Sequence, residues 1–145
     1  MRSSHRPVRP SLRALRRDCR GVTAIEFALV APTFFLVLYA MVELGWALLC
    51  YNQLGHAVYE AARYAIVHGA DSSDPADNAA VSDRVVAAAP HLGDAGITVT
   101  TTWDPDNEPG SVVTVSATYA YEPLLDLFGW GSFDLASSNE MVIAR

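Results

Sequence analysis

A continuous apolar run over residues 27–51 constrains the fold more than any other feature of the sequence. Glu43 is the only acidic or basic residue in these 25 positions, and twelve of them are Leu, Val or Phe. At about 1.5 Å of rise per residue, a helix of this length exceeds the roughly 30 Å hydrocarbon core of a bilayer. Transfer of the apolar side chains into lipid outweighs the cost of one mid-span carboxyl group, about 2.5 to 3.5 kcal/mol. The run therefore predicts a helix that crosses a membrane.

Basic residues are concentrated before this run. Residues 1–20 contain seven of the ten basic residues and one acid, whereas residues 22–145 contain fifteen acids and three arginines. Arginines beside a span hold that end in the cytoplasm. We therefore expect the N-terminus inside, the acidic remainder outside, and the chain in the cytoplasmic (inner) membrane. A basic arm can also bind nucleic acid, but that function requires a further basic surface, and the remainder is acidic. We expect no nucleic-acid partner.

The helix is expected to continue beyond the membrane. Apolar residues recur at helical spacing between residues 52 and 68, and Gly69 followed by "ADSSDP" is a stop signal. We predict one helix over residues 24–68, with residues 1–21 as a basic cytoplasmic leader, 22–51 in the membrane and 52–69 as an extension. The extension carries two ridges at i, i+4 spacing, which are Leu54, Val58, Ala62 and Ile66, and Ala57, Ala61, Ala65 and Gly69.

Residues 70–145 are expected to form an extracytoplasmic α+β domain. Asp74 is the predicted N-cap of a second helix over residues 75–89, with Pro75 at its first position. From Ile97 the apolar period changes to two, which predicts strands. The predicted strands cover residues 97–103, 113–121 and 133–143. The expected fold class is α+β, with a long N-terminal transmembrane helix, a short second helix and a small antiparallel sheet.

The residues around Gly21 follow a recognisable order. "RGVTAIEF" places a glycine after basic residues, then four mostly apolar residues, an acid and an aromatic residue. This order resembles the processing site of type IV-like pilins and pseudopilins, which a membrane aspartyl peptidase cuts after the glycine. A glycine suits that position because it lacks Cβ and allows close approach of the backbone. The candidate processing site is Gly21, Val22, Glu26 and Phe27.

The segment from Gly21 to His68 resembles the TadE/TadG-like family of tight-adherence pilus assembly systems. "AVYEAARYAIVHG" from Ala57 carries part of the resemblance, and "VTVSATYAYEPL" fits the strand-rich tail of the family more loosely. The resemblance implies a pilin-like fold. It also implies a role as a minor pilin, pseudopilin or assembly component, in the membrane or in the pilus. Its implied partners are a prepilin peptidase, other pilus subunits and membrane lipid. The other residues that carry the resemblance are Gly21, Ala24, Glu26, Phe27, Ala28, Pro32, Glu43 and Gly45.

The resemblance also suggests an explanation for Glu26. Cleavage after Gly21 would leave an ammonium group on Val22, and the Glu26 carboxylate five positions along the mature chain can neutralise it, within one subunit or between neighbours. Alternatively, Glu26 is simply an acid favoured at a helix N-terminus by the dipole. Candidate assembly or helix-packing residues are Glu26, Pro32, Glu43, Ala57, Ala61 and Ala65.

Two of these candidates lie within the span. Pro32 removes the backbone bond to the Ala28 carbonyl and should kink the helix. Glu43 either contacts another helix in the assembly or is a protonated carboxyl bonded locally.

Other chemistry is not indicated. The sequence has no nucleophile or phosphate-binding motif, so we expect no enzyme activity, cofactor or small-molecule substrate. His56, Glu60 and His68 could be mistaken for metal ligands. His56 and Glu60 share a helix face at i, i+4, but no third ligand has convincing spacing, and a solvated helix face is expected. The acidic turn at residues 104–108 is interrupted by proline and is expected to be a plain hairpin loop, not a calcium site. Cys50 is expected to be a small buried residue, with an intersubunit disulfide as the alternative. An uncleaved single-pass membrane-anchored binding or sensor domain is the main alternative function.

Overall fold

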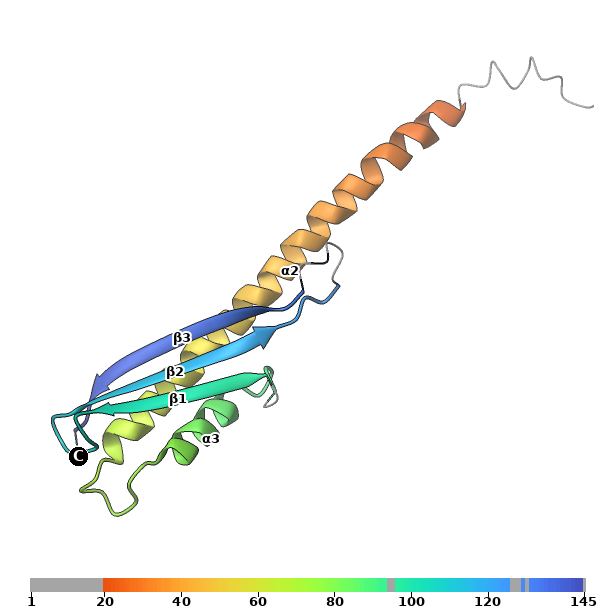
Figure 1. The fold of residues 1–145 in the computed structure, drawn as a ribbon. Helices are drawn as coiled ribbons and strands as arrows, with labels where there is room; N and C mark the ends of the chain where they lie inside the picture. Colours follow the sequence, from red (N-terminus) through yellow and green to blue (C-terminus); the bar gives the residue numbers. More distant parts are fainter. Residues whose placement is uncertain (1–19, 94–95, 126–128, 130, 145) are drawn as a thin grey trace, which may run out of the picture. The chain divides into compact units, whose positions relative to one another are not determined.

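The computed structural model describes residues 20–93, 96–125, 129 and 131–144, which form an α+β fold (Figure 1). The elements are α2 (Arg20–Val67), α3 (Asn78–Ala88), β1 (Ile97–Asp104), β2 (Val112–Tyr121) and β3 (Phe133–Val142). The long helix, short helix and three strands confirm the predicted fold class. The chain divides into two compact units, Met1–Met41 and Val42–Arg145, which we describe separately. The basic leader predicted at residues 1–21 lies almost entirely outside the described residues.

The bounds of α2 differ from the prediction mainly at its start. The helix begins at Arg20, four residues before the predicted start, and ends at Val67, one residue before the predicted end. At its C-terminus the His68 N–H lies 3.2 Å from both the Tyr64 and the Ala65 carbonyl oxygens. Such shared bonds are common where a helix ends.

The sheet is a three-stranded antiparallel meander in the order β1-β2-β3 (Figure 1). Thr101 of β1 and Asn139 of β3 both pair with Val115 of β2. Exposure alternates along all three strands, as the period of two predicts. The inner face of β2 carries Val113, Val115, Ala117, Tyr119 and Tyr121, all of which were predicted to share a face.

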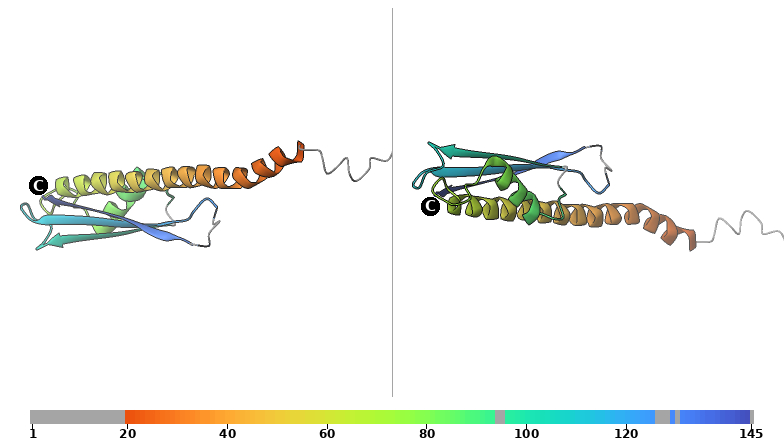
Figure 2. Two further views of the ribbon diagram at one scale, coloured as in Figure 1. Left: turned by 90° about the horizontal axis from the view of Figure 1, so that it is seen from above. Right: turned by 90° about the horizontal axis from the view of Figure 1, so that it is seen from below.

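The core of the second unit lies between the inner face of the sheet and the two helices (Figure 2). Leu54 and Val58 of α2, Val81 and Val85 of α3, and Val115 of β2 are fully buried there. The predicted helical ridges therefore face this core. Burial of these apolar side chains is the main force that holds the sheet to the helices.

The predicted small-residue stripe on α2 is also inside this core. Ala57, Ala61 and Ala65 each have 0% exposure. Gly55 comes equally close to the sheet, because a Cβ at that position would lie 3.7 Å from the Ser137 hydroxyl oxygen. The small side chains thus allow close packing within the chain. The three alanines therefore pack within their own chain, and a role for them in assembly stays a prediction.

The start of α3 corrects a second expectation. Asp77, and not Asp74, is the N-cap, and its side chain accepts a hydrogen bond from Ala80 N at 2.7 Å. Residues 75–77 lie outside the helix, and Ala76 is held by tertiary contacts. The Ala76 N–H bonds to the His68 carbonyl at 2.7 Å, and the Ala76 carbonyl accepts from the Asn107 amide at 3.3 Å.

Candidate functional site

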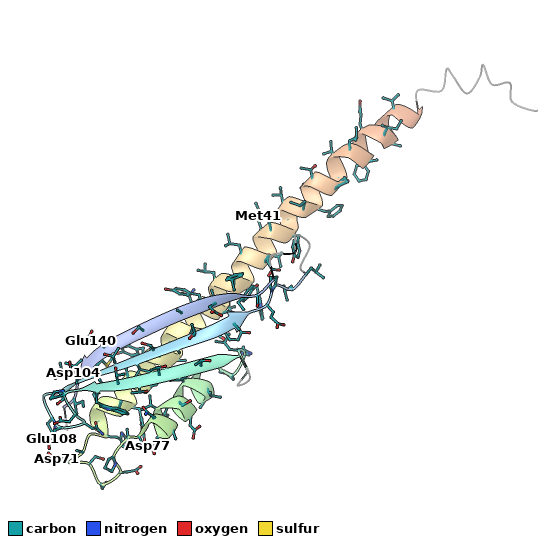
Figure 3. All side chains as sticks on the ribbon, in the orientation of Figure 1. Met41, Asp71, Asp77, Asp104, Glu108 and Glu140 are labelled. Carbon is teal, nitrogen blue, oxygen red and sulfur yellow. The ribbon has the colours of Figure 1, made fainter. Side chains whose placement is uncertain are left out.

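The first unit presents an apolar surface. Side chains project from several sides of α2 before Met41 (Figure 3), and α2 is the one helix in the described part of the chain that is long and apolar enough to cross a membrane. An apolar surface of this extent requires cover by lipid or by other protein. The large apolar side chains of this unit are 42% to 73% exposed, and they are Val22, Ile25, Phe27, Leu29, Val30, Phe34, Phe35, Leu36, Val37, Leu38 and Met41.

The candidate processing site lies at the start of α2. Gly21 and Val22 are in the first turn, where backbone N–H groups have no acceptor within the helix. Gly21 has no neighbouring atom within 4 Å of the position a Cβ would take, and Val22 and Phe27 are exposed. Glu26 is exposed as well. The geometry leaves this segment accessible to another protein, and its role in processing stays a prediction.

Pro32 lies inside α2 without ending it. Figure 2 shows a bend in the orange, N-terminal part of the helix, the part that contains Pro32. Proline lacks the N–H that would bond to the carbonyl four residues earlier, and its ring crowds that carbonyl. This is a sufficient cause for a bend of the kind expected from the sequence.

Glu43 accepts hydrogen bonds from the end of the sheet. Tyr121 Oη donates to Glu43 Oε1 at 2.6 Å, and the Leu124 N–H lies 3.1 Å from Oε1 and 3.3 Å from Oε2. We call Glu43, Tyr121 and Leu124 the Glu43 junction. Tyr121 is 1% exposed, and its ring centroid lies 4.9 Å from that of Phe133. Short bonds to a carboxylate are among the stronger hydrogen bonds in proteins. The junction therefore fastens the end of β2 to α2.

In the Glu43 junction the side chain of Glu43 bonds to its own chain, whereas one interpretation of the sequence placed it against another helix. Its carboxylate has partners within its own chain, 78 and 81 residues away in sequence. Sequence reasoning did not identify Tyr121 or Leu124 as partners. The available signal was the position of Tyr121 as the last inward-facing residue of β2, just before the turn that begins at Glu122.

Both His68 and the acidic turn, which could be mistaken for parts of metal sites, make hydrogen bonds within the chain. Among the described residues, no group of three or more His, Cys, Asp or Glu side chains is placed to hold a metal ion. His68 stacks on Tyr64 with 4.0 Å between ring centroids, and its Nδ1 lies 2.9 Å from the Tyr64 carbonyl oxygen. In the acidic turn, Asp106 Oδ1 accepts from the Ser111 hydroxyl at 2.7 Å and from the Glu108 N–H at 3.2 Å. These bonds stabilise a hairpin loop.

Cys50 is a free thiol with 2% exposure in the core of the second unit. This is the small buried residue expected from the sequence. A disulfide to another subunit would require the thiol to leave the core.

Over the residues that the structure describes, these features define a chain with one candidate membrane-spanning helix that continues into a small α+β unit. Residues 21–63 match the family described as TadE-like protein. The match confirms the resemblance to the TadE/TadG-like family over the segment that contains Glu26, Pro32 and Glu43, and it supports a component associated with a tight-adherence (Tad) pilus. No curated protein and no solved structure gives a significant match to the chain.

Proposed function

We propose that this protein is a single-pass component of a tight-adherence pilus system in the cytoplasmic membrane, as a minor pilin, pseudopilin or assembly subunit. One observation carries the proposal: the TadE-like match coincides with a helix whose first part is apolar and exposed. The arginines before Gly21 favour a cytoplasmic N-terminus, which leaves the α+β unit outside. The protein acts through packing and protein contact, without chemistry of its own.

The first part of α2 supplies the packing surface. Its Phe, Leu and Val side chains contact lipid in the membrane and equivalent helices in an assembly, and the Pro32 bend shapes that contact. Apolar side chains gain little from exchanging lipid for another helix, so association requires close packing and polar pairing. Glu26 provides the polar group. A carboxylate paired with a Val22 ammonium in low dielectric would fix the stagger between neighbouring helices.

Cleavage is tested by the intact mass of the protein purified from its native cells. Removal of residues 1–21 is the expected result, with Val22 as the new N-terminus. Gly21→Ala should reduce cleavage, because the added Cβ obstructs close approach of the peptidase to the backbone. Gly45→Ala is the matched control, since a Cβ meets no atom within 4 Å at either glycine. A full-length product from the unsubstituted chain would favour the uncleaved membrane-anchored binding or sensor domain.

The Glu26 pairing is tested by Glu26→Ala. We expect unchanged membrane insertion and impaired pilus output, because the ammonium would lose its partner. Glu140→Ala removes the same charge from an exposed position on β3 and should leave output unchanged. Normal pilus output from the Glu26→Ala strain would contradict the pairing.

A further inference from the structure

The turn after β2 exposes apolar side chains beside the Glu43 junction. Leu124 is 54% exposed and Leu125 is 58% exposed. Phe133, which starts β3 and pairs with Tyr121 across the sheet, is 47% exposed. We call these three exposed side chains, at the end of β2 and the start of β3, the Leu124 patch. Exposed apolar patches mark sites of contact with a membrane or with another protein.

The position of this patch along α2 is set by hydrogen bonds. The Leu124 N–H lies within 3.1 Å of a Glu43 carboxylate oxygen, so the turn sits at the level of Glu43. Glu43 directly follows residues 21–42 of α2, in which Glu26 is the one acidic or basic residue. Those 22 residues rise about 33 Å, close to the roughly 30 Å hydrocarbon thickness. A span that fills the hydrocarbon core with residues 21–42 therefore brings Glu43 and the Leu124 patch to the membrane–water interface.

The helix residues that follow Glu43 suit that depth. The interfacial layer adds about 5 to 7 Å on each side of the hydrocarbon core. Trp46 lies three residues after Glu43, about 4.5 Å along the axis, and is 40% exposed. Tryptophan is enriched at this depth in membrane proteins because its ring is apolar and its N–H is polar.

The opposite end of the second unit is acidic. Asp71, Asp104, Glu108 and Glu140 lie toward this end, away from the patch (Figure 3). A second hydrogen bond shows which part of α2 lies beside this end of the unit. Ala144 N, just after β3, donates to the Ile66 carbonyl at 3.0 Å. Ile66 is 23 residues beyond Glu43, about 35 Å along the helix. The end near Ile66 thus carries these four acids, while the end beside Glu43 carries the Leu124 patch flanked by the exposed acids Glu122 and Asp134.

We propose that the Leu124 patch rests in the interfacial layer of the same bilayer that α2 crosses, as a second membrane contact. This inference rests on the proposed membrane span. The Glu43 carboxylate then lies at the membrane–water interface, where Tyr121 and Leu124 donate hydrogen bonds to it. The part of α2 within the hydrocarbon core then ends at Val42. Two contacts on one membrane, the helix and the patch, restrict the tilt of the α+β unit over the surface.

Depth-dependent fluorescence quenching tests the contact. The full chain carries Cys19→Ser, and an environment-sensitive fluorophore is attached to a single introduced cysteine at Leu124→Cys. Cys50 stays unlabelled because it is buried, and the Cys19→Ser chain alone controls for this. The protein is reconstituted into phosphatidylcholine–phosphatidylglycerol vesicles that contain lipids with a nitroxide on the headgroup or high on the acyl chain. Glu108→Cys provides the control at the acidic end, and Leu36→Cys provides a reference within the span.

The proposal predicts that the shallow nitroxides quench the label at position 124 severalfold more than the label at position 108. Position 36 should be quenched best by nitroxides deep in the acyl chain. Deep quenching at 36 with equal, weak quenching at 124 and 108 would overturn the patch contact alone. Absence of deep quenching at 36 would overturn the span and the patch contact together. Energy transfer between copies labelled at 124, without lipid quenching, would assign the patch to a second copy and also overturn the proposal.

Discussion

The two parts of α2 share one backbone geometry but present different surfaces. Before Val42 the helix is apolar on several sides, and its large side chains are exposed. Between Val42 and Val67, residues three and four apart such as Leu54, Val58 and Ala61 are fully buried, while His56 and Arg63 remain exposed. Both parts are α-helical, so the secondary structure itself does not distinguish them. The difference lies in what covers the side chains.

Glu43 marks the change between the two parts. After it, one face of the helix is covered by the sheet of the same chain, and hydrophobic burial supplies the stability. Before it, the large apolar side chains are exposed, and under the proposed function lipid or other protein covers them. A helix can thus carry an amphipathic pattern and a uniformly apolar pattern in succession, and each pattern specifies its own surroundings. The predictions below probe this division, beginning with the largest expected effect.

Two arginines in the middle of the first part should abolish membrane insertion. Each arginine at mid-span costs about 2.5 to 3.5 kcal/mol, so Leu36→Arg with Val37→Arg costs roughly 5 to 7 kcal/mol. Cell fractionation followed by carbonate extraction measures the result. Tyr59→Arg with Val67→Arg places the same charges on exposed positions of the second part and should leave insertion unchanged. Equal loss from both pairs would contradict the division.

Leucine-to-alanine changes should separate the buried face of the second part from its exposed face. Leu54 is 0% exposed and Leu48 is 57% exposed on the same helix. Leu54→Ala should lower the free energy of unfolding by about 2 to 5 kcal/mol, because it removes buried methyl groups and leaves a cavity. Leu48→Ala should change it by roughly 0.5 kcal/mol or less. Denaturant unfolding of the full chain in detergent micelles measures both. Similar losses would mean that the face carrying Leu48 is also packed in the folded chain.

Local patterns predicted most of this fold because they reflect local geometry. The i, i+4 spacing of Leu54 and Val58 identified the buried face of α2, and the alternation through Val113 and Val115 identified the inner face of β2. The cap of α3 was misassigned because Asp74 and Asp77 are both good caps by sequence. Only a tertiary bond, from Ala76 N to the His68 carbonyl, decides between them.

The candidate site was only partly predictable for the same reason. The exposed segment around Gly21 and Glu26 could be found from residue order. The partners of Glu43 could not, because a hydrogen bond between residues 43 and 121 depends on the packing of the whole sheet against α2. The alanine stripe at Ala57 and Ala61 correctly indicated close packing, but composition does not say whether the partner is a sheet of the same chain or another subunit.

Loss of one hydroxyl should weaken the attachment of the sheet to α2. Tyr121→Phe removes the donor to Glu43 and keeps the ring that packs on Phe133. Hydrogen bonds to charged groups contribute about 1.5 to 3 kcal/mol, so we expect a loss of that order in the free energy of unfolding. Tyr59→Phe, at an exposed tyrosine of α2, is the control and should have little effect. Equal stability of the two variants would show that the Glu43 junction does not hold the sheet.

Alkaline pH should loosen the second part of α2 and leave the first part intact. Burial raises the pKa of Tyr119 above its ordinary value of 10.0, with smaller contributions from the charges of Cys50 and Glu122. The folded state thus holds the phenol proton more tightly than the unfolded state. Its stabilising effect is complete below the ordinary tyrosine pKa and is lost as pH rises through the folded value.

Unfolding of the full chain in micelles across this pH range measures the effect. The near-ultraviolet signal of the packed sheet should weaken while the helical signal of the first part persists, because the core residues around Tyr119 belong to the second unit. Tyr119→Phe removes the titrating group, and its stability should decline less steeply at high pH. An equally steep decline in this variant would assign the alkaline sensitivity to other groups, and simultaneous loss of all helical signal would show that the two parts of α2 do not depend on separate surroundings.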